Sequence, residues 1–396
     1  MSLPVLLDLS HTSHTRARTG IQRVARSLLG ALREEARPIT YDPHLRAWRP
    51  LEAWEQENLG AKSADRKRGA QWPLQAKMRA RARRWLGSGP ISRKTAFPEH
   101  NGILVPEVFS AEVAKALPAL FRATAGPRVA IFHDAIALKF PELTPSKTVA
   151  RFPAYLQELL AFDGIAANSE DSRDSLLDYW QWAGFTKTPP VTAIPLGVDV
   201  REVVSVHAAP DTALPIVLSV GSIEGRKNHL ALLAACEKLW ERGMLFELRL
   251  IGLTHPQTGR IASERINALK SAGRSLCYNG PLADAAVDTA YAECAFTVYP
   301  SLIEGFGLPV IESLAHGKPC VCSGRGAIGE SARGGGCVSV DVTDVSQLAA
   351  SMARLLESPT ELSALAKAAR ARHFKSWDGY AEELMDWMRT LPRRTD

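Results

Sequence analysis

Residues 299–312 read YPSLIEGFGLPVIE, and this stretch decides the fold class. A buried strand is expected to end near Tyr299, and a loop with two glycines follows. Pro309 suits the first turn of a helix, where a missing N–H loses no partner. Strand, glycine loop and helix N-terminus in this order predict backbone N–H groups that bind phosphate or sugar oxygens. Glu304 and Glu312 should flank the same polar pocket and accept hydrogen bonds from sugar or ribose hydroxyls.

A second stretch, residues 217–228, has the same order of features and reads VLSVGSIEGRKN. Its strand is expected to end at Gly221, and Arg226 and Lys227 come directly before the next predicted helix. Two cations beside the positive end of a helix dipole favour a pyrophosphate group. The spacing is not that of an ATPase P-loop, because the chain has no Gly-x4-Gly-Lys-Ser/Thr string.

Strands and helices alternate along almost the whole chain, which indicates parallel sheets covered by helices on both faces. We predict an α/β fold with two Rossmann-like, doubly wound parallel-sheet domains that face a cleft. Ligands of such sheets bind at the carboxyl ends of the strands, where both stretches above end. The predicted strands are 5–10, 38–42, 45–51, 102–106, 128–134, 164–169, 191–197, 215–221, 246–252, 275–279, 295–299, 318–323 and 337–340.

The predicted domain boundaries follow the change in pattern along the chain. The N-terminal domain covers 1–198 and carries an irregular, basic insertion at 52–100, which matches no known pattern. The C-terminal domain covers 199–375, and the aperiodic start of this region, near 198–213, is expected to be the linker. A last amphipathic helix within 376–396 should pack back across the interface.

The composition is that of a globular protein and excludes several classes. Hydrophobic residues make up 46% and charged residues 23% of the 396 residues, which excludes a mainly disordered chain. No apolar run approaches the roughly 18 residues that span a bilayer, and the start MSLPVLLDLSHTSH lacks the basic region of a signal peptide. Six cysteines occur singly in apolar strings, which predicts reduced thiols and a cytoplasmic protein. We expect the Cys320 and Cys322 side chains to point to opposite faces of a strand, which argues against a redox pair.

Positive charge is concentrated in one segment, residues 62–94. This segment holds eleven Lys and Arg against one Asp and carries +10, whereas the whole chain carries +6. A helix at 72–86 with basic residues on its remaining faces is typical of a helix lying on an anionic membrane, which we predict as a partner. The alternatives are a disordered loop and a nucleic-acid contact, and we expect no nucleic acid. The apolar stripe of this helix is formed by Leu74, Met78, Ala82 and Trp85.

The stretches 217–228 and 299–312 lie about 80 residues apart. In this order they resemble the retaining glycosyltransferases of the glycosyltransferase family 4 type, which are group 1 glycosyltransferases with the two-domain GT-B fold. The resemblance is closest from 190 to 385. Weaker similarity covers 1–50 and 128–197, where three strings resemble parts of the family's first domain: Thr19–Arg23, Phe132–Asp134 and Pro195–Asp199.

The resemblance implies a role for each residue around the donor nucleotide. Arg226 and Lys227 would hold the donor diphosphate and stabilise it as a leaving group. Gly20 would let the backbone approach that diphosphate. Glu312 would bind the ribose hydroxyls, and Ser222 would border the nucleoside.

It also implies how the sugar is held. Glu304 would bind the donor sugar near its reacting carbon, and His133 would lie at the sugar from the opposite domain. The backbone amides of Phe306, Gly307 and Leu308 would hold sugar and phosphate oxygens. The family needs no metal, and this chain has no Asp-x-Asp at a strand end to hold a diphosphate-bound cation. We therefore expect no metal or other cofactor, and same-face attack by the acceptor.

The resulting hypothesis is a hexosyltransferase that uses a nucleotide diphosphate sugar. GDP-mannose is favoured, because the Thr-Gly-Ile string resembles mannosyltransferases. The acceptor would be a hydroxyl of a glycan or lipid-linked saccharide in cell-surface polysaccharide synthesis, at the inner membrane face. Two alternatives stay open: a glycan phosphorylase or synthase of the same architecture, and a non-catalytic sugar-nucleotide or membrane-binding module.

Overall fold

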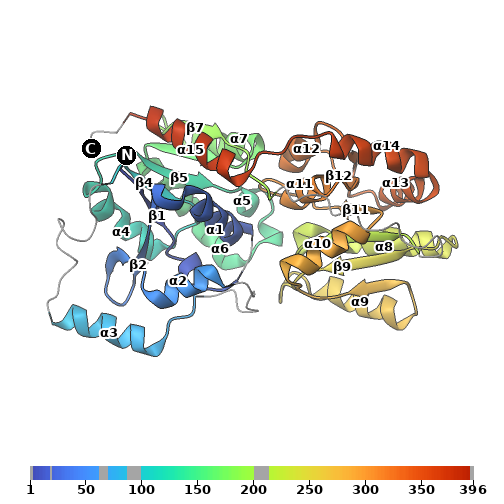
Figure 1. Ribbon diagram of the computed structural model, residues 1–396, viewed down its shortest axis with the longest axis horizontal. Coiled ribbons are helices and arrows are strands. Elements are labelled where there is room, and N and C mark those ends of the chain that lie inside the picture. Colours follow the sequence, from blue (N-terminus) through green and yellow to red (C-terminus); the bar gives the residue numbers. More distant parts are fainter. Residues whose placement is uncertain (1–2, 18–19, 62–69, 87–99, 200–213, 393–396) are drawn as a thin grey trace. The chain divides into compact units, whose positions relative to one another are not determined.

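A computed structural model of the chain describes residues 3–17, 20–61, 70–86, 100–199 and 214–392. They form two compact units, each described by itself below (Figure 1). The first unit comprises Met1–Ala135, Ser146–Leu196 and Trp377–Asp396, and the second comprises Ile136–Pro145 and Gly197–Ser376. Most of the predicted linker, 200–213, lies outside the described residues.

The first unit is built on a seven-stranded sheet with the order β3-β2-β1-β4-β5-β6-β7. All neighbours pair in parallel except β2 and β3, which form an antiparallel hairpin at one edge. Every residue of β1, β4, β5 and β6 is buried, as expected for central parallel strands that are covered on both faces. The strands are β1 (Val5–Asp8), β2 (Ala36–Asp42), β3 (Ala47–Pro50), β4 (Ile103–Val105), β5 (Arg128–Phe132), β6 (Gly164–Ala167) and β7 (Val191–Ala193).

Helices cover the first sheet, and the last of them comes from the end of the chain. Helix α15 packs against α1, and it buries Tyr380, Leu384 and Met388 almost completely. The α-helices are α1 (Gly20–Leu32), α2 (Ala53–Gly60), α3 (Leu74–Trp85), α4 (Ala111–Arg122), α6 (Ser146–Glu158), α7 (Glu170–Trp182) and α15 (Trp377–Thr390). The 3-10 helices are η1 (Thr12–His14), η2 (Arg33–Glu35) and η4 (Leu159–Ala161).

The predicted irregular insertion contains two helices. The helix expected at 72–86 is α3, but α2 was not predicted. Its N-cap is Glu52, whose backbone N–H donates to Glu55 Oε2 over 2.7 Å in a capping box. Ser, Thr, Asp and Asn are the residues that usually mark this position, so the sequence carries no clear start signal there. The rest of the insertion, 62–69 and 87–99, lies outside the described residues.

The second unit is a doubly wound, six-stranded parallel sheet with the order β10-β9-β8-β11-β12-β13. The chain winds outward from β8 to β10 and then returns to β11 beside β8, so the switch point lies between β8 and β11. The strands are β8 (Ile216–Val220), β9 (Glu247–Ile251), β10 (Leu276–Tyr278), β11 (Phe296–Tyr299), β12 (Cys320–Ser323) and β13 (Cys337–Val340). The helices are α5 (Ile136–Lys139), η3 (Pro141–Leu143), η5 (Gly225–Lys227), α8 (His229–Glu241), α9 (Arg260–Ser271), α10 (Asp284–Glu293), α11 (Leu308–Ala315), α12 (Gly326–Ala332), α13 (Val345–Glu357) and α14 (Pro359–Arg370).

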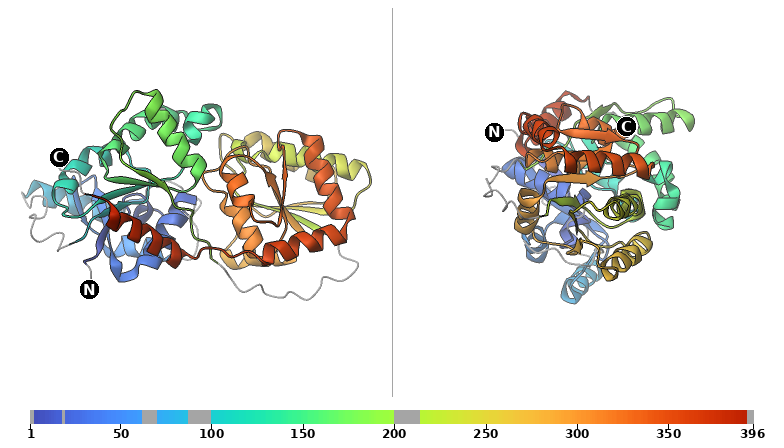
Figure 2. Two further views of the ribbon diagram at one scale, coloured as in Figure 1. Left: turned by 90° about the horizontal axis from the view of Figure 1, so that it is seen from above. Right: turned by 90° about the vertical axis from the view of Figure 1, so that its right-hand side faces the viewer.

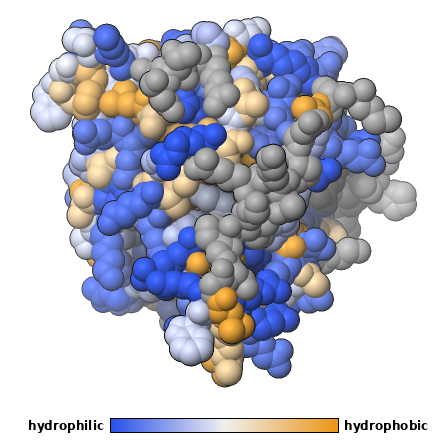
Figure 3. All heavy atoms as spheres, turned by 90° about the vertical axis from the view of Figure 1, so that its left-hand side faces the viewer, coloured by the Kyte–Doolittle hydropathy of each residue, from blue (hydrophilic) through white to orange (hydrophobic). Residues whose placement is uncertain are grey.

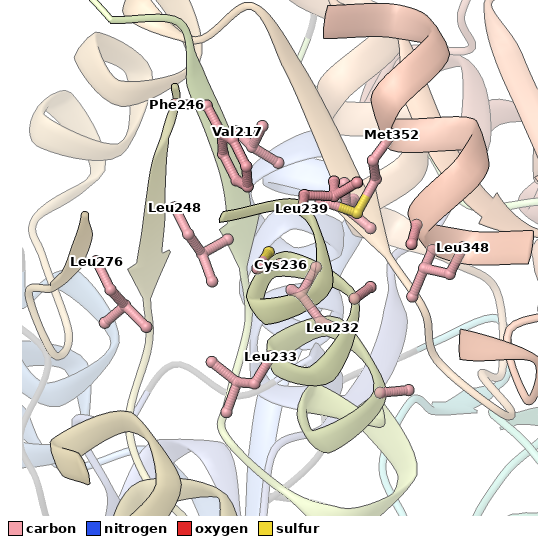
Figure 4. Packing of buried hydrophobic residues seen from close by; sticks show 14 of the residues in the cluster. Val217, Leu232, Leu233, Cys236, Leu239, Phe246, Leu248, Leu276, Leu348 and Met352 are labelled. Carbon is pink, nitrogen blue, oxygen red and sulfur yellow. The ribbon is translucent and has the colours of Figure 1, made fainter. Parts of the chain in front are cut away.

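Helices lie on both faces of the second sheet (Figure 2). On one face, side chains of α8 and α13 pack on the strands, and the close view shows Leu239 and Met352 beside Val217 of β8 (Figure 4). On the other face, Val310 and Leu314 of α11 pack with Tyr299. All of these side chains are buried, so the strands are held rigidly under the loops that leave them. No helix of the described residues has the length and hydrophobicity that crossing a membrane requires.

The cysteines of β12 correct one prediction. Cys320 and Cys322 do not point to opposite faces: their sulfur atoms and that of Cys337 all lie within 4.8 Å of one another. The prediction was wrong because residues i and i+2 of a strand share a face. Cys320 and Cys322 belong to the apolar cluster under α11, and all six cysteines of the chain are free thiols.

Candidate functional site

Two loops leave the second sheet at its carboxyl edge from neighbouring strands. One follows β8 and leads through η5 to α8, and the other follows β11 and leads to α11. The strands are parallel, with Val217 opposite Phe296. The loops are joined where the Leu302 N–H donates to the Arg226 carbonyl oxygen over 2.8 Å. The two sequence stretches singled out above therefore meet at the switch point of the sheet.

An ion cluster lies between these loops. Arg226 Nη1 donates to Glu304 Oε2 over 2.5 Å, and the Lys227 ammonium donates to Glu304 Oε1. Arg226 Nη2 also lies 2.7 Å from Glu224 Oε1. The Lys227 and Glu304 side chains are each 11% exposed. Three of the predicted site residues, Arg226, Lys227 and Glu304, are thus in direct contact.

The cluster controls the charge of Glu304. Burial alone would raise the pKa of this carboxyl group, but the charges of Arg226 and Lys227 outweigh burial and lower the pKa to about 2. Glu304 is therefore a carboxylate at neutral pH. At neutral pH Glu304, the predicted sugar ligand, therefore stays ion-paired with Arg226 and Lys227, the predicted diphosphate ligands.

His229, the first residue of α8, is a neighbour of the cluster that sequence reasoning missed. Burial, followed by the charge of Lys227, lowers the pKa of His229 to about 3, so its ring is neutral. Its Nδ1 atom is buried and has no hydrogen-bond partner among the described residues. The only sequence signal was its place directly after the string Arg226–Asn228.

The glycine loop before α11 has the backbone geometry that the sequence suggested. Gly307 is the N-cap of α11 and has φ +94° and ψ +37°, a left-handed conformation that favours glycine. The Ser331 hydroxyl donates to the Phe306 carbonyl and fixes the loop from the side of α12. Leu308 begins α11, and the first N–H groups of a helix have no intrahelical acceptor. The predicted amides at 306–308 therefore lie at a helix N-terminus.

The turns after β8 and β9 are packed so closely that a glycine is required. A Cβ atom at Gly252 would lie 1.9 Å from the Gly221 carbonyl oxygen. The Gly252 N–H also donates to the Gly280 carbonyl oxygen over 2.9 Å. Ser222, predicted to border the nucleoside, follows Gly221 in this packed edge and is partly exposed.

Glu312 lies in the second turn of α11 and is half-buried. The charge of Glu312 acts on Tyr299 at the end of β11. Burial, the neighbouring Tyr291 and the Glu312 charge all raise the pKa of Tyr299. Glu312 therefore lies close to the carboxyl end of β11.

His133 and Gly20 belong to the first unit. His133 follows β5 and is 5% exposed, and both of its ring nitrogens have partners: Nε2 lies 2.7 Å from the Pro106 carbonyl oxygen and Nδ1 lies 2.9 Å from Asn168 Nδ2. Burial lowers the pKa of His133, so the neutral ring donates from Nε2. Gly20 begins α1, and a Cβ atom there would meet nothing within 4 Å, so packing does not require this glycine.

Two carboxylates at the same edge of the first sheet were missed. Asp8 ends β1 and is 1% exposed; burial raises its pKa to about 7 against opposing hydrogen bonds from Ser10. Glu107 follows β4 and accepts from the backbone N–H groups of His11 and Thr12 over 2.9 and 2.8 Å. Their only sequence signal was a polar residue at or just after the end of a buried strand.

The chain is similar to known glycosyltransferases. The family "Glycosyl transferases group 1" matches residues 202–372, which include both loops of the ion cluster. A curated relative, the "Serotype-specific mannosyltransferase WbdA" of Escherichia coli, is 26% identical over 345 residues, which cover 80% of this chain and 38% of that protein. Another, the "O-antigen chain mannosyltransferase B" of Escherichia coli, is 26% identical over 66% of this chain and 70% of that protein. The chain thus spans little more than a third of the length of the first relatives.

Solved structures with the same fold match nearly the whole chain. Sucrose-phosphate synthase from Thermosynechococcus elongatus has a TM-score of 0.68 at 18% identity and covers 98% of both chains. The Anabaena protein Alr3699/HepE, in complex with UDP and glucose, has a TM-score of 0.68 at 15% identity and covers 98% of this chain. The predicted fold class, two Rossmann-like domains of the GT-B type, is confirmed.

Proposed function

We propose that this chain transfers a hexose from a nucleotide diphosphate sugar to a hydroxyl of a glycan or lipid-linked saccharide, and the match of residues 202–372 to the group 1 glycosyltransferases supports this. The observation that carries the proposal is the contact of Arg226, Lys227 and Glu304 at the switch point of the second sheet. Two cations and a carboxylate there suit a diphosphate next to a sugar.

The cations would act on the leaving group. Breaking the bond between sugar and nucleotide builds negative charge on the diphosphate, and cations that are already in place stabilise it with little reorganisation. Glu304 holds both cations in place. An ammonium group has three N–H donors, and among the described residues Glu304 is the one hydrogen-bond acceptor of the Lys227 ammonium. Lys227 can therefore keep its contact with Glu304 while it donates to a phosphate oxygen.

Glu304 would act on the sugar side. The reacting sugar gains positive charge as the bond breaks, and a carboxylate whose pKa lies at about 2 stays charged beside it. We propose transfer with retention by same-face attack, in which the acceptor hydroxyl enters on the side the diphosphate leaves. A double displacement would instead need a carboxylate nucleophile on the opposite face of the sugar.

For the donor we propose GDP-mannose and no metal ion. The names of the mannosyltransferase relatives support mannose. One protein of the same fold was solved in complex with UDP and glucose. A UDP-sugar is therefore the competing donor to test. Arg226 and Lys227 would take the place of a cation at the diphosphate.

For the biological setting we propose cell-surface polysaccharide synthesis at the cytoplasmic face of the inner membrane. The O-antigen name of one relative supports the pathway. The charge of +10 in residues 62–94 supports an anionic surface as a partner.

Two measurements in sequence test the function. The first is a thermal-shift screen of nucleotide diphosphate sugars, since a ligand at 100 times its dissociation constant adds about 2.7 kcal/mol of stability. The second is donor hydrolysis without acceptor, followed by product formation with mannosides and other saccharides. An enzyme should hydrolyse the stabilising donor slowly and transfer its sugar to an acceptor. Stabilisation without hydrolysis or transfer would instead identify a binding module and contradict the proposal.

A further inference from the structure

Helix α3 exposes its large apolar side chains and buries its small ones. Ala76 and Ala80 are 3% and 6% exposed, whereas Leu74, Met78 and Trp85 are 71%, 62% and 90% exposed. A helix on a globular domain ordinarily turns its large apolar side chains toward the core. The reversed arrangement means that packing within the first unit does not explain these three residues.

The exposed apolar residues form one line along the helix. At about 100° per residue, positions 74, 78 and 85 project within about 40° of one another, and the buried alanines project from the opposite side. Leu86, which follows the end of α3, is also exposed but does not continue this line. Figure 3 views the side toward which α3 projects in Figure 1, and apolar side chains lie there among hydrophilic ones at the lower end. Apolar surface gathered in this way marks a contact with a partner.

Cations border the apolar line on one side. Lys77, Arg81 and Arg84 lie along this side, and none of their side chains forms a hydrogen bond or ion pair with the described residues. Arg79 and Arg83 project away from the apolar line, toward the side of the buried Ala76, and both pair with Glu52 at 3.1 and 3.7 Å. Helix α3 contains no acidic residue. Arg81 and Arg84 are exposed and Lys77 is partly exposed, so these three cations lie beside the apolar line on the outward face.

We propose that this outward face of α3, defined by Leu74, Met78, Trp85, Lys77, Arg81 and Arg84, docks on an anionic lipid bilayer. The apolar line enters the headgroup region while the cations meet lipid phosphates and acidic headgroups. This inference rests on the membrane location proposed above, and it does not depend on the identity of the donor.

Charge and shape select the lipid surface over two other occupants. A second copy of the chain would bring two rows of like charges together at this face, which is unfavourable. A nucleic acid would meet the cations but leave the apolar line without a contact, since phosphate contacts need no apolar stripe. A bilayer interface satisfies both features at once.

The test is co-sedimentation of the full chain with two kinds of vesicle: phosphatidylcholine alone, and equal parts of phosphatidylcholine and phosphatidylglycerol. The chain should bind the anionic vesicles and release them as salt rises. Each cation near the surface contributes roughly fivefold in affinity. The variant Lys77→Gln, Arg81→Gln, Arg84→Gln should therefore bind on the order of 100-fold more weakly. Met78→Ser with Trp85→Ser should cost about tenfold or more.

Matched variants separate this surface from net charge and from hydrophobicity in general. Arg242→Gln, Lys270→Gln, Lys367→Gln removes three exposed cations from the second unit and should bind like the wild type. Trp182→Ser removes an indole of the first unit that is 80% exposed and should also leave binding unchanged. Thermal unfolding of each variant checks that it is folded.

Three outcomes would overturn the proposal. They are equal binding to both kinds of vesicle, equal binding by the α3 variants and the wild type, and tight binding to duplex DNA without binding to vesicles. Donor hydrolysis in the same samples keeps the two proposals apart. Vesicle binding without hydrolysis would leave this surface standing and contradict the catalytic function.

Discussion

The ammonium group of Lys227 donates a hydrogen bond to the carboxylate of Glu304, 77 positions further along the chain. The family resemblance assigned these residues to different parts of a donor, the diphosphate and the sugar. Their contact, which Arg226 shares, means that a change at one residue alters the charge and the freedom of the others. The predictions below use this coupling.

The first prediction concerns the leaving group. Lys227→Ala and Arg226→Ala should each lower turnover by roughly 100-fold, because each removes a cation that stabilises the departing diphosphate. Lys238→Ala, on the same helix-loop unit but at the far end of α8, is the control and should keep full turnover. Steady-state transfer assays give kcat and KM for all three. If both site variants turn over like the wild type, the assignment of the donor diphosphate to this loop is wrong.

The second prediction separates the two glutamates. Glu304→Gln removes the anion that pairs with Arg226 and Lys227, so the free nucleoside diphosphate should bind at least as tightly as before while turnover falls. Glu312→Gln should mainly weaken nucleotide binding, because its predicted partner is the ribose. Calorimetry with the nucleoside diphosphate, run beside transfer assays, measures both effects. Loss of nucleotide binding in Glu304→Gln but not in Glu312→Gln would reverse the two assignments.

The third prediction is that EDTA leaves turnover unchanged. Arg226 and Lys227 supply the positive charge at the proposed leaving group, so a divalent cation has no necessary part in the step. The assay is product formation in buffer treated with chelator, with and without added Mg²⁺ or Mn²⁺. A complete loss of activity that either ion restores would contradict this assignment.

The architecture was accessible from the sequence because its signals are local. Buried apolar strands that end in Gly221 or before the Gly305–Gly307 loop indicate both the parallel sheet and the edge where ligands bind. A doubly wound sheet then brings the ends of β8 and β11 together, so Arg226, Lys227 and Glu304 could be assigned to one region. Their direct contact could not be predicted, because it depends on where the side chains of residues 77 positions apart point.

The features that were missed lack local signals or were misinterpreted. Asp8 and Glu107 are single acidic residues, and only the pairing of β1 with β4 shows that they share an edge. His229 has no motif of its own. The error at Cys320 and Cys322 came from applying the two-residue period of a strand wrongly, since alternate residues share a face.

The fourth prediction is a loss of stability in acid that depends on Glu304. Its pKa falls from 4.5 to about 2 in the folded chain, so the ionised form stabilises the fold above pH 4.5 and this contribution disappears as the pH falls toward 2. Glu304→Gln does not titrate. The difference in free energy of unfolding between wild type and variant should be constant above pH 5. Below pH 5 the wild type should lose stability relative to the variant. Denaturant unfolding across this range measures the difference, and a difference that does not change with pH would contradict the ion pair.

The last prediction has the opposite sign and concerns Asp8. Burial raises its pKa from 3.8 to about 7, so the folded chain binds a proton that the unfolded chain has already lost over this range. This contribution to stability is complete below pH 3.8 and is lost as the pH rises through about 7. Asp8→Asn keeps an oxygen that can accept from the Ser10 N–H, which lies 2.9 Å from Asp8 Oδ1, and removes the titration.

Relative to Asp8→Asn, the wild type should therefore lose stability as the pH rises from about 4 to 7 and change little above that range. Glu107→Gln is the companion variant, because the negative charge of Glu107 also raises the pKa of Asp8. In that variant the loss should be complete at a lower pH. Urea unfolding at a series of pH values gives the three curves. Parallel curves for wild type and Asp8→Asn would mean that Asp8 is ionised in the folded chain, and the buried acid at the end of β1 would then need a cation near it.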